Sequence, residues 1–221
     1  MELAVLDMAG TTVADDGVVI RAFDEAATTV GLPTEGPDRD AARRYVLDTM
    51  GQSKIEVFRA LFGDEERAQQ ANVAFEQAYQ SAAGAGVRPI PGAAEAISDL
   101  RDAGVKVVLT TGFSGTTQAM LLDALGWTDI ADLVLTPGPG VRGRPYPDLV
   151  LTALMRTGVD DVAKVAVAGD TASDVVSGLR AGAPMVAGTL TGAHDEATLR
   201  NAGATHVIDS IADFPSIILS H

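Results

Sequence analysis

The amino-acid sequence predicts an α/β fold: a parallel sheet with helices on both faces, interrupted by a small all-helical domain. Three short apolar runs, at residues 3–6, 105–109 and 162–168, have the length of buried strands and end next to polar residues and glycine. Helix-patterned segments alternate with strand-like runs in the later part of the chain, which is typical of a parallel sheet. Residues 15–86, in contrast, show helix patterns and no convincing strand. We therefore expect a helical insertion after the first strand.

The remaining elements follow from the same patterns. Further short strands are predicted at 133–135, 185–186 and 206–208. Helices of the sheet-forming part are predicted at 93–103, 116–125, 147–157, 173–181 and 196–202. Helices of the insertion are predicted at 18–30, 38–50, 54–61 and 65–83. We assign 1–14 and 87–221 to the α/β core and 15–86 to the helical domain.

Composition restricts the possible partners of the protein. The chain has 221 residues, of which 47% are hydrophobic, so it can bury a substantial core. Its net charge of −14 disfavours binding to nucleic acid or to an anionic membrane. There is no cysteine, and hence no disulfide and no thiolate metal site. Glu2 lies where a signal peptide would be basic, and no apolar run is long enough to cross a bilayer, so we expect a cytoplasmic protein.

Polar side chains lie where the predicted strands end. Asp7 ends the first strand, and Asp170 and Asp174 follow the buried run at 162–168. Ligands of an open parallel sheet bind beyond the carboxyl ends of its strands. Paired carboxylates at that edge suit a hard cation such as Mg²⁺, with Asp7 completing the site. The alternative is that Asp170 caps a helix and Asp174 is an acidic residue of its first turn.

An anion site is predicted at the same edge. Thr111 and Gly112 follow the strand at 105–109 and offer a hydroxyl and a backbone N–H at a helix start. Arg144 lies in a further loop and offers a planar guanidinium that can hold phosphate oxygens. Considered singly, Thr111 is more simply interpreted as a helix cap and Arg144 as a solvated loop residue. The order of all these residues at successive strand ends favours one shared site.

The order Asp7, Thr111, Arg144, Asp170 and Asp174 resembles the four motifs of the haloacid dehalogenase superfamily. The resemblance covers nearly the whole chain and implies a Rossmann-like core with the helical domain as a cap. It implies that Asp7 attacks phosphorus. It also implies Mg²⁺ as the cofactor, held by the carboxylates of Asp7, Asp170 and Asp174.

One position departs from the common superfamily pattern D-x-D-x-T, because Ala9 replaces the second aspartate. D-x-A-G-T resembles the phosphonatase branch, the phosphonoacetaldehyde hydrolases. The same is true of TTGF, of Arg144 in GRPYPD, and of MGQSK, which is similar to the M-G-x-x-K of that branch. The resemblance implies that Lys54 forms a Schiff base, that Gly51 contacts the phosphonate, and that the Ala9 carbonyl is a metal ligand. Homodimers formed through the cap occur in the branch.

The missing acid has a chemical explanation. Hydrolysis of a phosphate ester expels an alkoxide, which a general acid protonates. Cleavage of a C–P bond expels a carbanion. A neighbouring protonated imine takes up its electron pair and becomes an enamine. Lys54 therefore becomes the essential group, and its amine requires a depressed pKa. The substrate would be phosphonoacetaldehyde or a related 2-oxoalkylphosphonate.

Three alternatives stay open on the sequence. Lys54 begins an amphipathic helix, and most lysines in that position are solvated. An ordinary phosphatase or phosphomutase that tolerates Ala9 would use Lys54 only as a substrate contact. A non-catalytic binding protein is the third alternative, and retention of the motif residues argues against it.

Several other positions bear on the proton transfers. The branch has a His three residues after its Lys and a Tyr after T-T-G, whereas this chain has Val57 and Phe113. Glu56 is the nearest replacement carboxylate, although helical geometry turns it away from Lys54.

The three histidines are interpreted as surface or loop residues, namely His194, His206 and His221. Trp127 and Tyr146 are read as packing residues, and Phe58, Leu61 and Phe62 as cap core or a cap-to-cap surface.

Overall fold

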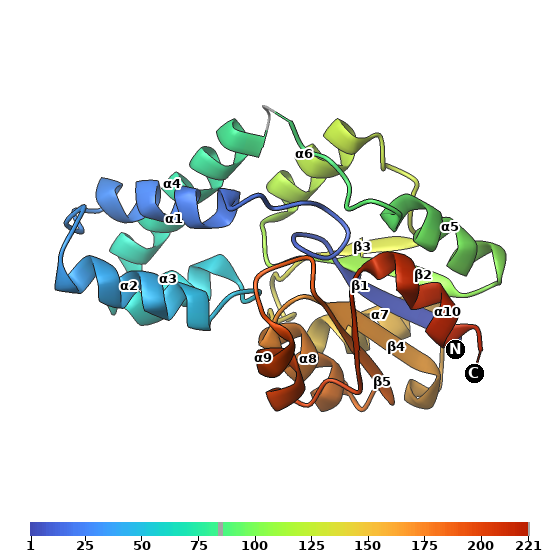
Figure 1. Cartoon of the computed structure of the whole chain (residues 1–221). Coiled ribbons are helices and arrows are strands. Elements are labelled where there is room, and N and C mark those ends of the chain that lie inside the picture. The colour runs from blue at the N-terminus through green and yellow to red at the C-terminus, as the bar shows by residue number, and fades with distance from the viewer. Residues whose placement is uncertain (84–85, 221) are drawn as a thin grey trace.

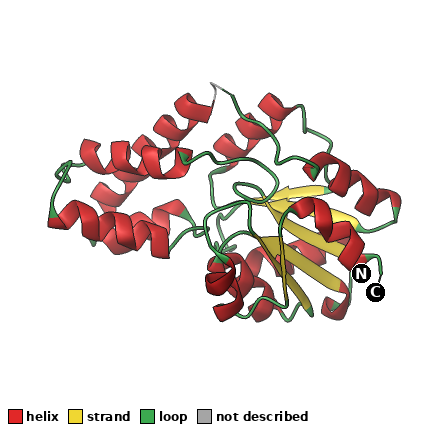
Figure 2. Cartoon of the chain, in the orientation of Figure 1, coloured by secondary structure: helices red, strands yellow, loops and turns green. Residues whose placement is uncertain are grey.

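The computed structural model describes residues 1–83 and 86–220 and contains a six-stranded parallel sheet (Figures 1 and 2). The strands are β1 Leu3–Asp7, β2 Lys106–Thr110, β3 Leu133–Leu135, β4 Val165–Gly169, β5 Met185–Thr189 and β6 His206–Ile208. Their order is β3-β2-β1-β4-β5-β6, and every neighbouring pair is parallel. The chain runs outward in both directions from β1, so the carboxyl ends of β1, β2 and β4 meet at one edge.

Both faces of the sheet are covered, as the apolar strands require. Side chains of β1 alternate between two hydrophobic clusters: Ala4 and Leu6 belong to one, Leu3 and Val5 to the other. The covering helices are α5 Ala93–Asp102, α6 Gly115–Leu125, α7 Asp148–Thr157, α8 Ala172–Ala181, α9 Glu196–Asn201 and α10 Phe214–Ile218. The predicted α/β class with a parallel sheet and helices on both faces is therefore confirmed.

Four helices lie between β1 and α5 and gather to one side of the sheet (Figure 1). They are α1 Val18–Thr29, α2 Pro37–Asp48, α3 Lys54–Phe62 and α4 Glu65–Ala83. Phe58 packs between three rings, with centroid distances of 5.9 Å to Phe23, 6.0 Å to Phe75 and 6.1 Å to Phe62. Phe58 and its neighbours therefore form the core of this helical cap.

Two expectations about individual residues need correction. Val162–Lys164 forms a 3-10 turn before β4, because the Asp161 side chain accepts a hydrogen bond from the Ala163 N–H at 2.9 Å. Tyr146 is 45% exposed, and its ring contacts the Arg142 guanidinium, so it is not a packing residue. His206 begins β6, whereas His221 lies outside the described residues. Trp127 is buried, as predicted.

No helix among residues 1–83 and 86–220 combines the length and the apolar character that crossing a membrane requires.

Replacing Phe58 by Ala is expected to destabilise the cap strongly. The side chain is 1% exposed, so truncation leaves a cavity among three aromatic rings. We expect a loss of about 3–5 kcal/mol in the free energy of unfolding, measured by urea titration. Val73 on α4 is 54% exposed, and Val73→Ala serves as the control with a change within about 0.5 kcal/mol. Equal effects of the two substitutions would contradict the packing described here.

Candidate active site

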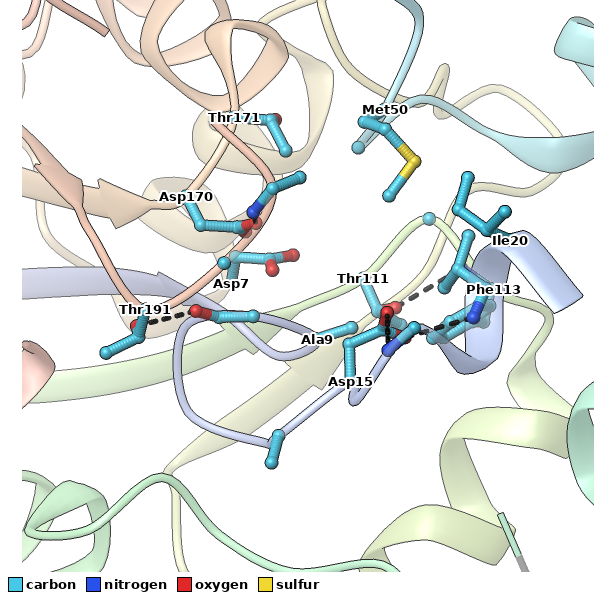
Figure 3. Close-up of a pocket in the computed structure, with 18 of the residues that line it drawn as sticks. Asp7, Ala9, Asp15, Ile20, Met50, Thr111, Phe113, Asp170, Thr171 and Thr191 are labelled. Atoms are coloured by element: carbon cyan, nitrogen blue, oxygen red, sulfur yellow. Dashed lines mark hydrogen bonds between the residues drawn. The ribbon is translucent and has the colours of Figure 1, made fainter. Parts of the chain in front are cut away.

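The carboxyl ends of β1, β2 and β4 place polar residues around one pocket (Figure 3). Asp7 is the last residue of β1 and pairs in register with Thr110 of β2. Asp170 directly follows β4, which pairs with the other side of β1. The pocket has a volume of about 480 Å³ and is lined by residues of both the core and the cap. Adjacent parallel strands thus bring together residues that are far apart in the sequence.

Asp7, Asp170 and Asp174 form a buried acidic cluster. One oxygen from each carboxylate lies within 4.8 Å of the others, and no residue of the three is more than 5% exposed. Asp170 is held from both sides, accepting hydrogen bonds from the Ala193 N–H at 2.7 Å and the Thr11 hydroxyl at 3.2 Å.

Thr171, and not Asp170, is the N-cap residue of α8. Its side chain accepts a hydrogen bond from the Asp174 N–H, and the Asp174 carboxylate accepts from the Thr171 N–H at 3.1 Å. The alternative interpretation of Asp170 as a simple helix cap is therefore wrong. The capping box has a second consequence, because it directs the Asp174 carboxylate toward the end of β4, where it joins Asp7 and Asp170.

Burial shifts the ionisation of the cluster. Desolvation raises the pKa of Asp7 well above its ordinary value, and the Arg144 guanidinium opposes that rise. Desolvation and the neighbouring Asp174 raise the pKa of Asp170 to about 7. Clustered carboxylates that are costly to ionise without a cation suit a divalent metal with oxygen ligands. Asp7, Asp170 and Asp174 therefore fit the predicted Mg²⁺ site, and Ala9 lines the same pocket.

Arg144 is the buried positive charge beside this cluster. Its guanidinium forms ion pairs with Asp7 and Asp174, and the residue is 5% exposed. Its Nε has no hydrogen-bond partner among the described residues. Arg144 is therefore not a solvated loop residue: it lines the pocket with donor capacity that an anion can use.

Thr111 and Gly112 lie at the end of β2, on the wall of the same pocket. Thr111 is buried, and its hydroxyl accepts a hydrogen bond from the Phe113 N–H at 3.2 Å. Ser114 caps α6 by accepting from the Thr117 N–H, so Thr111 is not the cap of that helix. A Cβ on Gly112 would lie 2.7 Å from the Gln52 carbonyl oxygen, so glycine lets the cap approach the core closely.

The cap contributes the segment before α3 to the pocket. Gly51 has φ +82°, and a Cβ there would lie 2.3 Å from the Thr171 hydroxyl oxygen. Only a glycine allows this turn to rest on the start of α8. The turn carries Met50 into the pocket, and Lys54 follows as the first residue of α3. All the sequence-predicted residues except Asp174 line this pocket, and Asp174 lies directly behind it in the acidic cluster.

Lys54 is half-buried, and its surroundings favour the neutral amine. The Nζ lies 5.8 Å from the ring centroids of both Phe75 and Phe113. Desolvation, followed by the charge of Arg144, lowers the pKa of Lys54 to about 8, although Asp15 acts in the opposite direction. Lys54 is therefore not a solvated surface lysine, and it shares the pocket with Asp7 and Arg144.

Three residues near the pocket were not predicted from the sequence as site residues. Asp15 lines it, although its position shortly before a predicted helix gave no signal. His194 accepts a hydrogen bond on Nδ1 from the Ala172 N–H at 2.9 Å, which fixes the loop after β5 against α8. Glu76 of α4 accepts hydrogen bonds from the Ser114 N–H at 3.2 Å and the Ser114 hydroxyl at 2.6 Å, and so joins the cap to α6.

Comparison with known proteins agrees with this geometry. A family model described as haloacid dehalogenase-like hydrolase matches residues 1–182. The chain therefore belongs to the haloacid dehalogenase-like hydrolases.

Individual relatives point to two activities. Phosphonoacetaldehyde hydrolase of Pseudomonas aeruginosa is 30% identical over 210 residues, covering 87% of this chain and 74% of that protein. A Dickeya dadantii protein named "Probable phosphatase IndB" is 26% identical over 217 residues, covering 96% and 90%. The solved structure of a phosphonoacetaldehyde hydrolase-like protein from Oleispira antarctica has a TM-score of 0.84 at 26% identity, covering 99% of this chain and 91% of that one.

Hydrolases of this family generally use Mg²⁺, and the acidic cluster of this chain predicts a pH dependence for the binding of such an ion. The pKa of Asp170 rises from 3.8 to about 7 on folding, so the folded chain binds more protons between these values. The free energy of unfolding of the metal-free protein therefore falls as the pH rises through that window. Mg²⁺ should therefore stabilise most at pH 8, above the pKa of Asp170, where the Asp170 carboxylate is ionised.

Thermal unfolding with and without Mg²⁺ tests this expectation. At a hundredfold excess over the Kd, Mg²⁺ should raise the midpoint by about 5–10 °C at pH 8. The increase should be much smaller at pH 5.5, because protons compete for the same oxygens. Asp170→Asn should remove most of the increase at pH 8. A stabilisation that is equal at both pH values and survives this substitution would place the metal elsewhere.

Proposed function

We propose that this protein hydrolyses the C–P bond of phosphonoacetaldehyde or a related 2-oxoalkylphosphonate. One observation carries the proposal: a lysine with a depressed pKa lines the same pocket as Asp7, where Ala9 replaces the usual acid. The pocket therefore supplies an amine nucleophile and a carboxylate nucleophile. In a carbonyl phosphonate, the electrophilic carbonyl carbon can react with the amine, and the phosphorus atom can react with the carboxylate.

Lys54 prepares the substrate for cleavage. Its neutral amine adds to the carbonyl carbon, and loss of water leaves a protonated imine. This imine withdraws electrons from the neighbouring carbon, which bears the phosphorus. When the C–P bond breaks, its electron pair forms the C=C bond of an enamine, and the imine nitrogen becomes neutral.

Asp7 receives the phosphoryl group. Its carboxylate attacks phosphorus and forms an aspartyl phosphate, which water then hydrolyses to release phosphate and the free carboxylate. Thr111, Gly112 and Arg144 bind the phosphonate oxygens and offset their negative charge. Mg²⁺ held by Asp7, Asp170 and Asp174 would neutralise further charge on the same oxygens. Protonation of the enamine carbon and hydrolysis of the imine release the aldehyde or ketone from Lys54.

The shape of the pocket bears on the substrate. Asp7 and Asp170 lie on one side, and Ile20, Met50 and Phe113 lie across from them (Figure 3). Leu47, which is 50% exposed, adds a further apolar side chain on the cap side. The volume of about 480 Å³ exceeds that of a two-carbon phosphonate, so an alkyl substituent on the carbonyl has room on this apolar side.

The alternative is a phosphatase acting on a small phosphate ester. The similarity to the Dickeya dadantii protein supports it. Asp7 would keep its role, and Lys54 would act as a positive charge that contacts the substrate. The two proposals differ at Lys54, because only the C–P reaction passes through a covalent bond to its amine.

Borohydride reduction discriminates between these two functions. Wild-type protein is incubated with phosphonoacetaldehyde and borohydride, and its mass is measured beside Lys54→Arg, which retains the charge. We expect an added ethyl or phosphonoethyl group on the wild type only, mapped to Lys54 by peptide sequencing. Phosphate release from simple esters without any adduct would establish the phosphatase instead.

The rate of adduct formation, plotted against pH, should have an acidic limb whose midpoint lies near pH 8. The pKa of Lys54 is lowered to about 8, so the reactive neutral amine increases tenfold per pH unit well below that value. The rate of adduct formation at subsaturating substrate should rise with this slope from pH 6 and level off above about 8. An acidic limb near pH 10 would show that Lys54 keeps the pKa of a solvated lysine.

A further inference from the structure

The proton transfers of imine chemistry have no obvious acid in the sequence. Val57 and Phe113 hold the two positions where the resemblance leads one to expect proton-transfer residues. Val57 is buried, and Phe113 offers only its ring to Lys54. Glu56 is exposed and forms an ion pair with Arg59 at 2.6 Å, so it points away from the amine. An acid has to come from another part of the pocket.

Carboxylates among the described pocket-lining residues leave one candidate. Asp7 and Asp170 belong to the acidic cluster, and Asp16 forms an ion pair with Arg88 at 2.7 Å. Asp15 is the carboxylate that remains, and it is drawn beside Ala9 and Thr111 in Figure 3. We propose that Asp15 is the acid–base residue that serves the Schiff base of Lys54. This proposal rests on the function proposed above.

The local structure holds the Asp15 side chain in a fixed place and leaves some of its hydrogen-bond acceptor sites free. Its carboxylate accepts hydrogen bonds from the Gly17 N–H at 3.1 Å and the Val19 N–H at 3.2 Å, one on each oxygen. A carboxyl group has about four lone-pair sites, so both oxygens can still face the pocket. The bonds orient the side chain at the start of α1, the first helix of the cap.

The electrostatic setting suits a group that both gives and takes a proton. Burial raises the pKa of Asp15 above its ordinary value, while the two backbone N–H groups, Lys54 and Arg21 oppose the rise. The charge of Asp15 in turn raises the pKa of Lys54. Tyr79 packs on Phe113 at 4.3 Å between ring centroids. Burial, together with the charges of Asp15 and Asp7, raises the pKa of Tyr79, so its hydroxyl stays protonated.

In the proposed steps, Asp15 first donates a proton and later regains one. In its acid form it donates a proton to the hydroxyl of the carbinolamine on Lys54, the C–O bond breaks, and water leaves. The carboxylate that results lies beside the protonated imine. After C–P cleavage, a proton from solvent adds to the enamine carbon, and hydrolysis of the aspartyl phosphate returns a proton to solvent. Water then attacks the product imine, and Asp15 takes a proton from that water, which forms the carbinolamine of the product and regenerates the acid. Cleavage of the C–N bond of this carbinolamine releases the carbonyl product and the Lys54 amine.

Asp15→Asn removes the ionisable group, while the amide oxygen of asparagine can still accept one of the two backbone hydrogen bonds. We expect phosphate release from phosphonoacetaldehyde and the rate of borohydride trapping to fall together, by about 100-fold or more. Thermal stability should stay near that of the wild type. Asp16→Asn is the matched control, with the same change of charge one residue away, and should retain both rates within about twofold.

A purely electrostatic role predicts the opposite result. Removing the Asp15 charge would lower the pKa of Lys54 further, and trapping at pH 7 would become faster. Trapping in Asp15→Asn that is equal to or faster than in the wild type would therefore overturn the proposal while leaving the C–P function intact. Absence of any trapped adduct in the wild type would overturn the proposed function itself, and the role of Asp15 with it.

Discussion

Burial of three carboxylates at one edge of the sheet is the constraint on which the site depends. Desolvation and the neighbouring carboxylates make the charges of Asp7 and Asp170 costly. The fold places them there because β1 and β4 are neighbours and because the capping box of α8 directs Asp174 inward. Arg144 offsets part of the repulsion. The same arrangement that is costly in the free protein favours the binding of a divalent cation.

The cap supplies the lysine that lines the pocket, Lys54, and small residues allow it to do so. Gly51 rests against Thr171, and Gly112 rests against the Gln52 carbonyl, so the segment before α3 sits directly on the strand ends. Glu76 adds hydrogen bonds from α4 to the first turn of α6. Together these contacts place Lys54 between Phe113 of the core and Phe75 of the cap. Its pKa is thus set by how the two parts meet.

The sequence predicted most of the core of the site, because polar residues after buried strands stand out against their apolar surroundings. Asp7, Thr111 and Asp170 carry that signal. Asp15 does not, since a carboxylate near a helix start is common and its inward direction depends on how the chain enters the cap. Tyr146 was misjudged for a similar reason: an aromatic side chain in a loop can pack inside or contact an arginine at the surface.

Loss of the acid at position 9 becomes intelligible when the geometry and the chemistry are considered together. An acid at Ala9 would lie next to Asp7, where a leaving oxygen would depart from phosphorus. In C–P cleavage no oxygen leaves, and the proton is needed at the carbinolamine on Lys54. Asp15 faces the pocket from the start of the cap and interacts with the charge of Lys54. In the proposed reaction, the proton donor would therefore lie where the imine forms.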